Sequence, residues 1–274
     1  MGIIRIKPTW ARKPPTGVQR DSGHPLSLGM IYGYVFDEGA GLPMTESGNN
    51  RQDASLTATA WITGPDGPAL SATGVTGKFY APSLVDLGTA TGTVVWRMLP
   101  AFSPTDGVTH YMWGTFAAGG EFGAQKFFDN NWYVGWNFSV DRRVTFAAAT
   151  ANLTQDVWQH YAFTWSSAGS FLYRNGLQIG TNGTGPTVGA VSGFGWLRPD
   201  NDGGVNGIGA GSAIDLALVY NRVLSISDIQ WSFQEPFAFM KPPKYREYFF
   251  VEPAAAAGDA VPAVWSQYRR RFAG

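Results

Sequence analysis

Residues 26–234 contain short runs of apolar residues, many of them alternating with polar ones, and turn residues separate one run from the next. Strands of about four to eight residues bounded by Gly, Pro, Asn and Asp have this pattern. Eleven such runs are typical of two packed antiparallel sheets. The predicted strands are Met30–Phe36, Ser55–Thr63, Gly92–Leu99, His110–Phe116, Trp132–Phe138, Arg142–Ala147, Trp158–Trp165, Ser170–Arg174, Leu177–Thr181, Gly193–Leu197 and Ile214–Tyr220.

Two local signals fix a turn and a helix within this region. In FLYRNGLQIG the pair Asn175-Gly176 lies between two alternating runs, and both residues tolerate the positive φ of a two-residue hairpin turn. Ser225 offers an N-cap with Asp228 three residues later, ahead of Ile229. We therefore expect a tight hairpin whose role is architectural, and one short helix near residue 226.

The composition agrees with an all-β chain. Charged residues make up only 15%, while Gly occupies 35 positions and Pro 17, the balance of many strands joined by turns. With no Cys there can be no disulfide and no thiolate metal site, which fits assembly in a reducing compartment such as a bacterial cytoplasm. The start, MGIIRIKPTWARKPP, has no signal-peptide core, and no run is long enough to span a bilayer. We expect no membrane partner.

Charge and proline divide the chain into three parts. Residues 1–20 contain five basic residues and no acid, a charge of +5. Residues 241–274 contain six basic and three acidic residues (+3), and the remaining nine basic and 17 acidic residues give 21–240 a charge of −8. We predict an extended N-terminal arm (1–25), a β-sandwich (26–236) and an aromatic, basic C-terminal arm (237–274).

These arms carry side chains suited to a partner surface, or to the sandwich edge in the case of the aromatics. Apolar rings are costly to leave in water, and clustered arginines favour acidic groups. The predicted partner-binding residues are Trp10, Arg12, Lys13, Phe237, Phe239, Tyr245, Tyr248, Phe249, Arg269, Arg270 and Arg271. Binding of nucleic acid by the three arginines is not expected, because the chain is net neutral.

The segments WQHYAFTWSSAGSFLYRNGLQIG (158–180) and AIDLALVYNRVLSISDIQ (213–230) resemble the laminin-G or concanavalin A-like jelly-roll module. The matching positions are Trp158, His160, Ala162, Tyr173, Asn175, Gly176, Asp215, Tyr220, Asn221, Arg222, Leu224 and Ser225. This resemblance implies a two-sheet antiparallel jelly-roll sandwich. It does not by itself imply a function, because such folds host many.

A second resemblance lies in the flanking sequence. PTWARKPP, HPLSLGMIYGYVFDEGAG and EPFAFMKPPKYREYFF are similar to segments of tailed-bacteriophage virion proteins that carry a jelly-roll module. The expectation is a non-enzymatic virion protein, a capsid decoration or cement protein docked by its arms to capsid or other virion proteins, and homo-oligomeric. The alternative is a lectin-like receptor-binding or fibre protein that holds a host glycan.

The remaining candidate chemistry is sparse. Glycosidases of this fold place acids as Glu-x-Asp-x-Glu or Glu-x-Asp-x-x-Glu, and neither pattern occurs, so we predict no catalytic residue and read His160 as a hydrogen-bonded strand residue. Asp200 and Asp202 lie in the loop RPDNDGGVNG, whose composition suits Ca²⁺ and equally an exposed turn; no other cofactor is expected. The aromatics near turns that could stack on a sugar are Trp132, Tyr133, Trp136 and Trp196.

Overall fold

The computed structural model describes residues 2–5, 10, 12–42, 55–82, 90–117, 120–136, 143–146, 153–183, 193–197, 207–241 and 247–250. The chain divides into two compact units, one of residues 11–241 and one that combines residues 1–10 with 242–274. The domain boundaries expected after residues 25 and 236 therefore both fall inside the larger unit.

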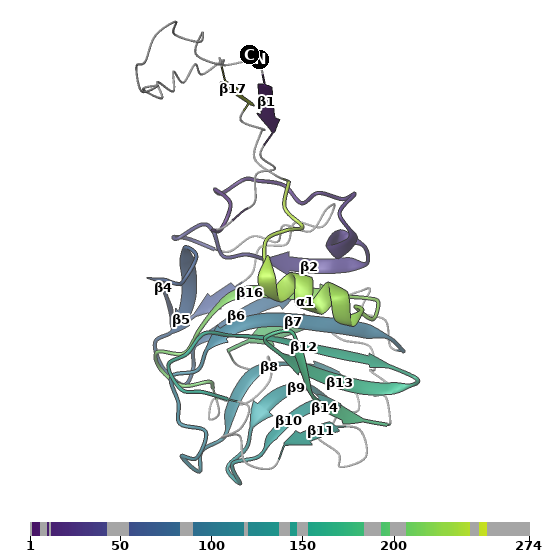
Figure 1. Ribbon diagram of the computed structural model, residues 1–274. Helices are drawn as coiled ribbons and strands as arrows, with labels where there is room; N and C mark the ends of the chain where they lie inside the picture. Colours follow the sequence, from purple (N-terminus) through teal and green to yellow (C-terminus); the bar gives the residue numbers. More distant parts are fainter. Residues whose placement is uncertain are drawn as a thin grey trace, which may run out of the picture. The chain divides into compact units, whose positions relative to one another are not determined.

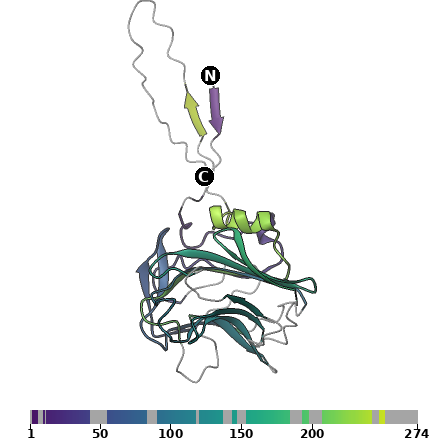
Figure 2. The same cartoon turned by 60° about the horizontal axis from the view of Figure 1, so that its bottom comes forward.

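Two antiparallel sheets make up the larger unit, and they lie face to face (Figures 1 and 2). The seven-stranded sheet has the order β11 (Arg143–Phe146), β10 (Trp132–Trp136), β9 (Gly120–Lys126), β8 (His110–Ala117), β15 (Gly193–Trp196), β6 (Lys78–Pro82) and β3 (Ser55–Thr57). The eight-stranded sheet has the order β14 (Leu177–Asn182), β13 (Gly169–Arg174), β12 (Gln159–Ser166), β7 (Gly92–Leu99), β16 (Ala213–Tyr220), β5 (Pro68–Ala72) and β4 (Thr59–Thr63), and β2 (Met30–Tyr34) also pairs with β16. This architecture confirms the predicted all-β sandwich.

Aromatic side chains from the two sheets meet in the core between them. Trp96 of β7 contacts Trp113 of β8 edge to face, with ring centroids 5.6 Å apart, and Phe122 of β9 meets Trp165 of β12 at 4.9 Å. All four side chains are buried. The period-two alternation of β12 places Phe163 and Trp165 on this inner side. The alternating apolar residues that predicted this strand are therefore residues of the core.

The outer face of the eight-stranded sheet is also covered. Every residue of β16 is buried, because α1 (Ile226–Gln234) lies across this side of the sheet (Figure 1). The helix begins with the predicted capping box between Ser225 and Asp228. It is the one α-helix among the described residues. Neither it nor any other helical segment of those residues is long and apolar enough to cross a bilayer.

Segments on either side of the predicted sandwich complete this outer layer. Phe237, Phe239 and Met240 are buried, and Asp21 donates its backbone N–H to the Phe239 carbonyl at 2.8 Å. The short 3₁₀ helix η1 (Pro25–Ser27) is capped by His24, whose ring lies 4.5 Å from that of Trp231 on α1. Residues 11–25 and 237–241 of the predicted arms are thus part of the larger unit.

The predicted hairpin joins β13 and β14. Asn175 and Gly176 both have positive φ, 49° and 78°, as the two-residue turn requires. A Cβ on Gly176 would lie 3.4 Å from Phe233 of α1. The turn therefore closes the sheet and packs against the helix, which agrees with an architectural role.

The smaller unit contains a two-stranded antiparallel ribbon. β1 (Gly2–Arg5) pairs with β17 (Glu247–Phe250), with Ile4 opposite Tyr248. The N-terminal and C-terminal segments are thus joined by backbone hydrogen bonds, although more than 240 positions separate them in the sequence.

Candidate functional site

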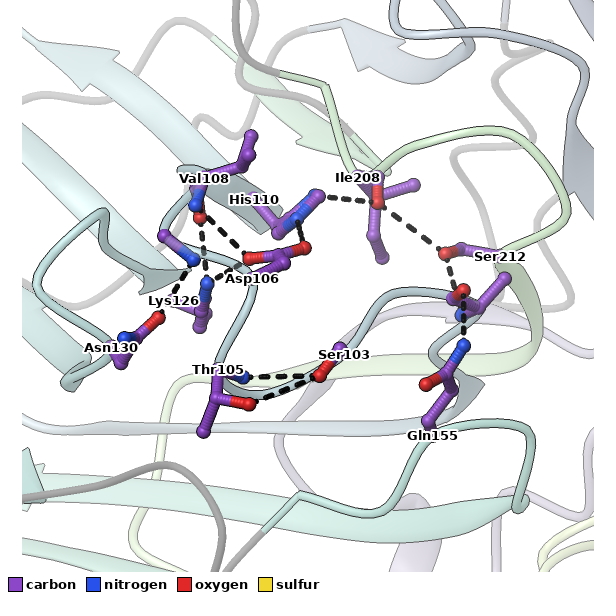
Figure 3. A network of polar contacts seen from close by, with 12 residues as sticks. Ser103, Thr105, Asp106, Val108, His110, Lys126, Asn130, Gln155, Ile208 and Ser212 are labelled. Carbon is purple, nitrogen blue, oxygen red and sulfur yellow. Dashed lines mark hydrogen bonds and ion pairs between the residues drawn. The ribbon is translucent and has the colours of Figure 1, made fainter.

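Three charged or ionisable side chains meet at one end of the seven-stranded sheet, and we call Asp106, His110 and Lys126 the rim cluster (Figure 3). His110 begins β8 and Lys126 ends β9, and the two residues are directly paired across the strands. Asp106 comes from the loop before β8. It accepts hydrogen bonds from His110 Nε2 at 2.6 Å and from the Lys126 ammonium.

The rim cluster is electrostatically matched although Lys126 is fully buried. Partial burial of Asp106 opposes its ionisation, but the Lys126 ammonium, the Val108 amide and His110 outweigh that effect and lower the pKa of the carboxyl. Lys126 Nζ also donates to the Val108 carbonyl at 2.9 Å, and His110 Nδ1 lies 3.0 Å from the Ile208 carbonyl oxygen. The cluster therefore fixes a loop to the sheet rather than presenting a free catalytic group.

Neighbouring hydrogen bonds extend this support to an adjacent turn. The Gly107 amide donates to Asn130 Oδ1 at 3.0 Å, which joins the loop before β8 to the turn between β9 and β10. On the other side, Ser212 Oγ accepts from the Ala101 amide at 2.9 Å and Gln155 Nε2 donates to the Ala101 carbonyl at 3.1 Å. Loop and turn are thus held in a defined arrangement.

Two large apolar side chains are exposed on this supported loop and turn. Val108 is 51% exposed and Phe128 60%, and we call them the rim patch. Asp129 and Asn131 follow Phe128 in this turn, and the Asn131 amide donates to the Asp129 carboxylate at 2.9 Å. An exposed ring beside polar groups on a rigid support is what a small ligand or sugar needs for stacking and orientation.

The aromatics predicted to stack on a sugar lie elsewhere. Trp132 and Trp196 are buried in the core, and Tyr133 is buried with its hydroxyl donating to Asp129 Oδ2 at 2.6 Å. Trp132 packs edge to face on Tyr161 of the opposite sheet at 4.8 Å, so it has no free face for a ligand. For these three residues the structure corrects the expectation. Trp136 ends β10, and its side chain lies outside the description.

Phe128 was missed by sequence reasoning, although it lies only four residues before Trp132. The signal is present in the run FFDNNW: Asp and Asn after two phenylalanines predict a turn, and turns lie at the protein surface. Phe127 is partly buried and meets Tyr133 at 5.9 Å. Phe128 is therefore the member of the pair left to solvent.

Residues predicted to bind partners fall into several groups. Phe237 and Phe239 are buried on the outer sheet face, and Lys13 is buried with its ammonium on the carbonyls of Phe36 and Pro68. For Phe237 and Phe239 this is the alternative expected for the aromatics, burial against the sandwich, whereas Lys13 differs from the expectation that it faces a partner. Arg12 is exposed, and Trp10 belongs to the smaller unit. Tyr248 and Phe249 lie in β17, and their side chains are not described. The other predicted partner-binding residues, Tyr245, Arg269, Arg270 and Arg271, lie outside the described ranges.

The metal and histidine predictions have different outcomes. Asp200 and Asp202 lie outside the described residues, and among those that are described no three His, Cys, Asp or Glu side chains gather as metal ligands. His160 is buried and its Nε2 lies 3.2 Å from Ser232 Oγ. The expectation of a hydrogen-bonded strand residue is confirmed.

Solved structures share this fold at low sequence identity. They include the Trypanosoma rangeli sialidase in complex with sialic acid (15% identity, 77% of this chain, 33% of that chain, TM-score 0.58). They also include the binding domain of Paraclostridial Mosquitocidal Protein 1 (14% identity, 78% of this chain, 53% of that chain, TM-score 0.59). A third is the receptor binding domain of the botulinum neurotoxin C/D mosaic serotype (9% identity, 77% of this chain, 52% of that chain, TM-score 0.58). The chain spans about a third to a half of those structures, and the likeness concerns the fold alone.

The family of the chain is shown by its sequence. A comparison with curated proteins gave no match, whereas the model of one family matches residues 72–230, more than half of the chain. The matched region runs from the end of β5 into α1 and so contains most strands of both sheets and the rim cluster. The chain belongs to the concanavalin A-like lectin/glucanases superfamily.

Proposed function

We propose that this protein is a non-enzymatic structural component of a bacteriophage particle, a capsid decoration or cement protein attached through its terminal segments. The observation that carries the proposal is the ribbon of β1 and β17, which unites both segments in a unit of their own. Its partners would be capsid or other virion proteins, together with further copies of this chain, after assembly in a bacterial cytoplasm.

An isolated two-stranded ribbon is a poor final state for a chain. Two strands alone are marginally stable in water, and within the described ranges neither β1 nor β17 pairs with a third strand, so each offers an outer edge for pairing with another chain. The strands GIIR and EYFF are largely apolar, and the first 20 residues carry a charge of +5. A partner that offers a sheet edge would pair with the open strands, and acidic residues beside that edge would match the basic charge.

The attachment is tested by breaking the ribbon without touching the sandwich. Ile4→Pro removes a backbone donor from β1 opposite Tyr248, and a variant lacking residues 1–10 removes the strand. We expect at least a roughly tenfold loss of incorporation into particles purified from the host, because many copies act together. The melting temperature of the larger unit should stay unchanged.

Ile4→Val is the matched control, since it keeps both the backbone donor and the apolar character of β1. Incorporation of the proline variant at the level of the valine variant would contradict attachment through the ribbon.

The rim patch favours a second function, the binding of a carbohydrate. The exposed ring of Phe128 on a fixed turn is the specific observation, and the superfamily includes lectins. Stacking of a sugar on an aromatic ring supplies much of the affinity of such sites. In this case the protein would serve as a receptor-binding or fibre component of the particle.

A glycan array compares wild type with Phe128→Ala. We expect saturable binding to one class of sugar and at least a roughly tenfold loss with Phe128→Ala, about 1.4 kcal/mol. Leu177→Ala is the control, because Leu177 is equally exposed (67%) but lies in the β13–β14 hairpin, outside the rim patch. Equal losses in the two variants, or no saturable binding by wild type, would contradict this function.

A further inference from the structure

The segment 12–20 is bound to the outer face of the eight-stranded sheet, and we call it the clasp. Lys13 donates its backbone N–H to the Asp66 carbonyl at 3.0 Å, and Thr16 Oγ1 donates to the Asp37 carbonyl at 3.1 Å. Gly67, at φ 147°, brings its backbone against the side chain of Lys13, where a Cβ would lie 3.4 Å away. The clasp therefore has a fitted seat on the β4–β5 turn.

The Lys13 ammonium enters the protein at this seat. Its described acceptors are neutral backbone carbonyls, those of Phe36 at 3.3 Å and of Pro68. Only 9% of the residue is exposed. A charged ammonium in such a place loses most of its hydration, and carbonyl groups replace only part of it.

Four charged groups face Lys13 from the surrounding elements. They are Asp215 of β16, Arg97 of β7, Asp37 after β2 and Asp66 of the β4–β5 turn. Arg97 binds Asp215 through Nε and a second nitrogen and also pairs with Asp66 at 2.6 Å. Arg97 thus neutralises much of the charge of both carboxylates. Their stabilisation of the Lys13 ammonium is correspondingly weaker.

Asp37 supplies only a small part of the missing compensation. It is 8% exposed, and neither carboxylate oxygen has a hydrogen-bond donor among the described residues. Burial raises the pKa of this carboxyl, against the smaller opposing effects of its own backbone and of Lys13. Burial likewise lowers the pKa of Lys13 to about 8, and the nearby acids only partly offset it.

We infer that the clasp is a pH-sensitive latch, which opens more readily when Lys13 carries a proton and closes more tightly when Lys13 is neutral. The neutral amine still donates to the carbonyls of Phe36 and Pro68, so closing keeps its hydrogen bonds. In the open clasp Lys13 is hydrated and keeps its proton to a higher pH. The opening equilibrium therefore falls as pH rises from 7 to 9.

This latch would set how firmly the N-terminal segment is held to the sandwich, and it does not depend on the proposed function. Hydrogen exchange of the full-length chain measures it in peptides that cover residues 12–20, after correction for the intrinsic exchange rate. For wild type we expect opening to fall roughly tenfold between pH 7 and pH 9, the ratio given by a shift from the ordinary lysine pKa to about 8. Peptides from the β13–β14 hairpin should show no such change.

Lys13→Arg is the matched variant, since a guanidinium stays charged throughout this range. Its corrected exchange should not change between pH 7 and pH 9. Asp37→Asn removes a charge that favours protonated Lys13, so its transition should move to lower pH. A wild-type profile without pH dependence, or the same dependence in Lys13→Arg, would overturn the inference.

An NMR titration of the Lys13 side chain in wild type gives a readout that needs no variant. Titration near pH 8 supports the latch, and titration near the ordinary lysine value would overturn it even if Lys13→Arg failed to fold.

Discussion

Replacing Arg97 with methionine is expected to lower the free energy of unfolding by about 3–5 kcal/mol. Asp215 is fully buried, and Arg97 binds both its carboxylate oxygens, at 2.7 and 2.5 Å. Methionine keeps the apolar length of the side chain but leaves the buried carboxylate without its counter-charge. Unfolding in guanidinium chloride, followed by Trp fluorescence, measures the change.

A second variant separates loss of charge pairing from loss of packing. Arg97→Met combined with Asp215→Asn removes both charges, and we expect it to be more stable than Arg97→Met alone, because position 215 then carries no buried charge without its partner. A single variant that loses less than about 1 kcal/mol, or a double variant with the summed loss of its parts, would show that the pair is solvated in solution.

Mild acid is expected to destabilise the sandwich through His160. Burial, and to a lesser extent the charge of Arg97, lowers the pKa of His160 to about 3 in the folded protein, whereas the unfolded chain has the ordinary value near 6.5. Below pH 6.5 the unfolded state therefore binds the additional proton, and stability falls as pH falls towards the folded pKa. The slope from this residue alone is about 1.4 kcal/mol per pH unit.

His160→Gln is the control for this slope. Its amide can keep the hydrogen bond to Ser232 that His160 Nε2 makes but takes up no proton in this range. Guanidinium chloride unfolding between pH 6.5 and pH 5 should show a steeper loss for wild type than for the variant, because the carboxylates are the same in both proteins. Parallel curves would mean that His160 binds its proton equally well in the folded and unfolded states.

The elements with strong local signals could be predicted from the sequence. Asn175-Gly176 encodes its own turn, and Ser225 with Asp228 encodes the start of α1. Within the two large sheets, three strands were not predicted: β5 (PALSA), β6 (KFYAP) and β9 (GEFGAQK). Each contains proline or glycine, which weaken a strand signal, and each is a strand because its neighbours pair with it, β9 with β8 and β10 for example.

The candidate sites depend on contacts that no local pattern records. Trp132 and Phe128 lie on the same hairpin, and only the position of the opposite sheet decides that the first is buried and the second exposed. Lys13 belongs to a basic, proline-rich run that looks like a solvated arm. Its burial follows from the carbonyls of Phe36 and Pro68, which lie 23 and 55 positions away.

The end of the clasp lies next to the exit of the larger unit. Arg20 and Met240 form an antiparallel bridge, beside which Lys241 donates its backbone N–H to the Gln19 carbonyl at 2.8 Å. A mechanical load that pulls the two terminal segments apart would separate the ribbon, then the bonds of the clasp and of this junction, one after another. The two large sheets would bear tension only after this small junction had given way.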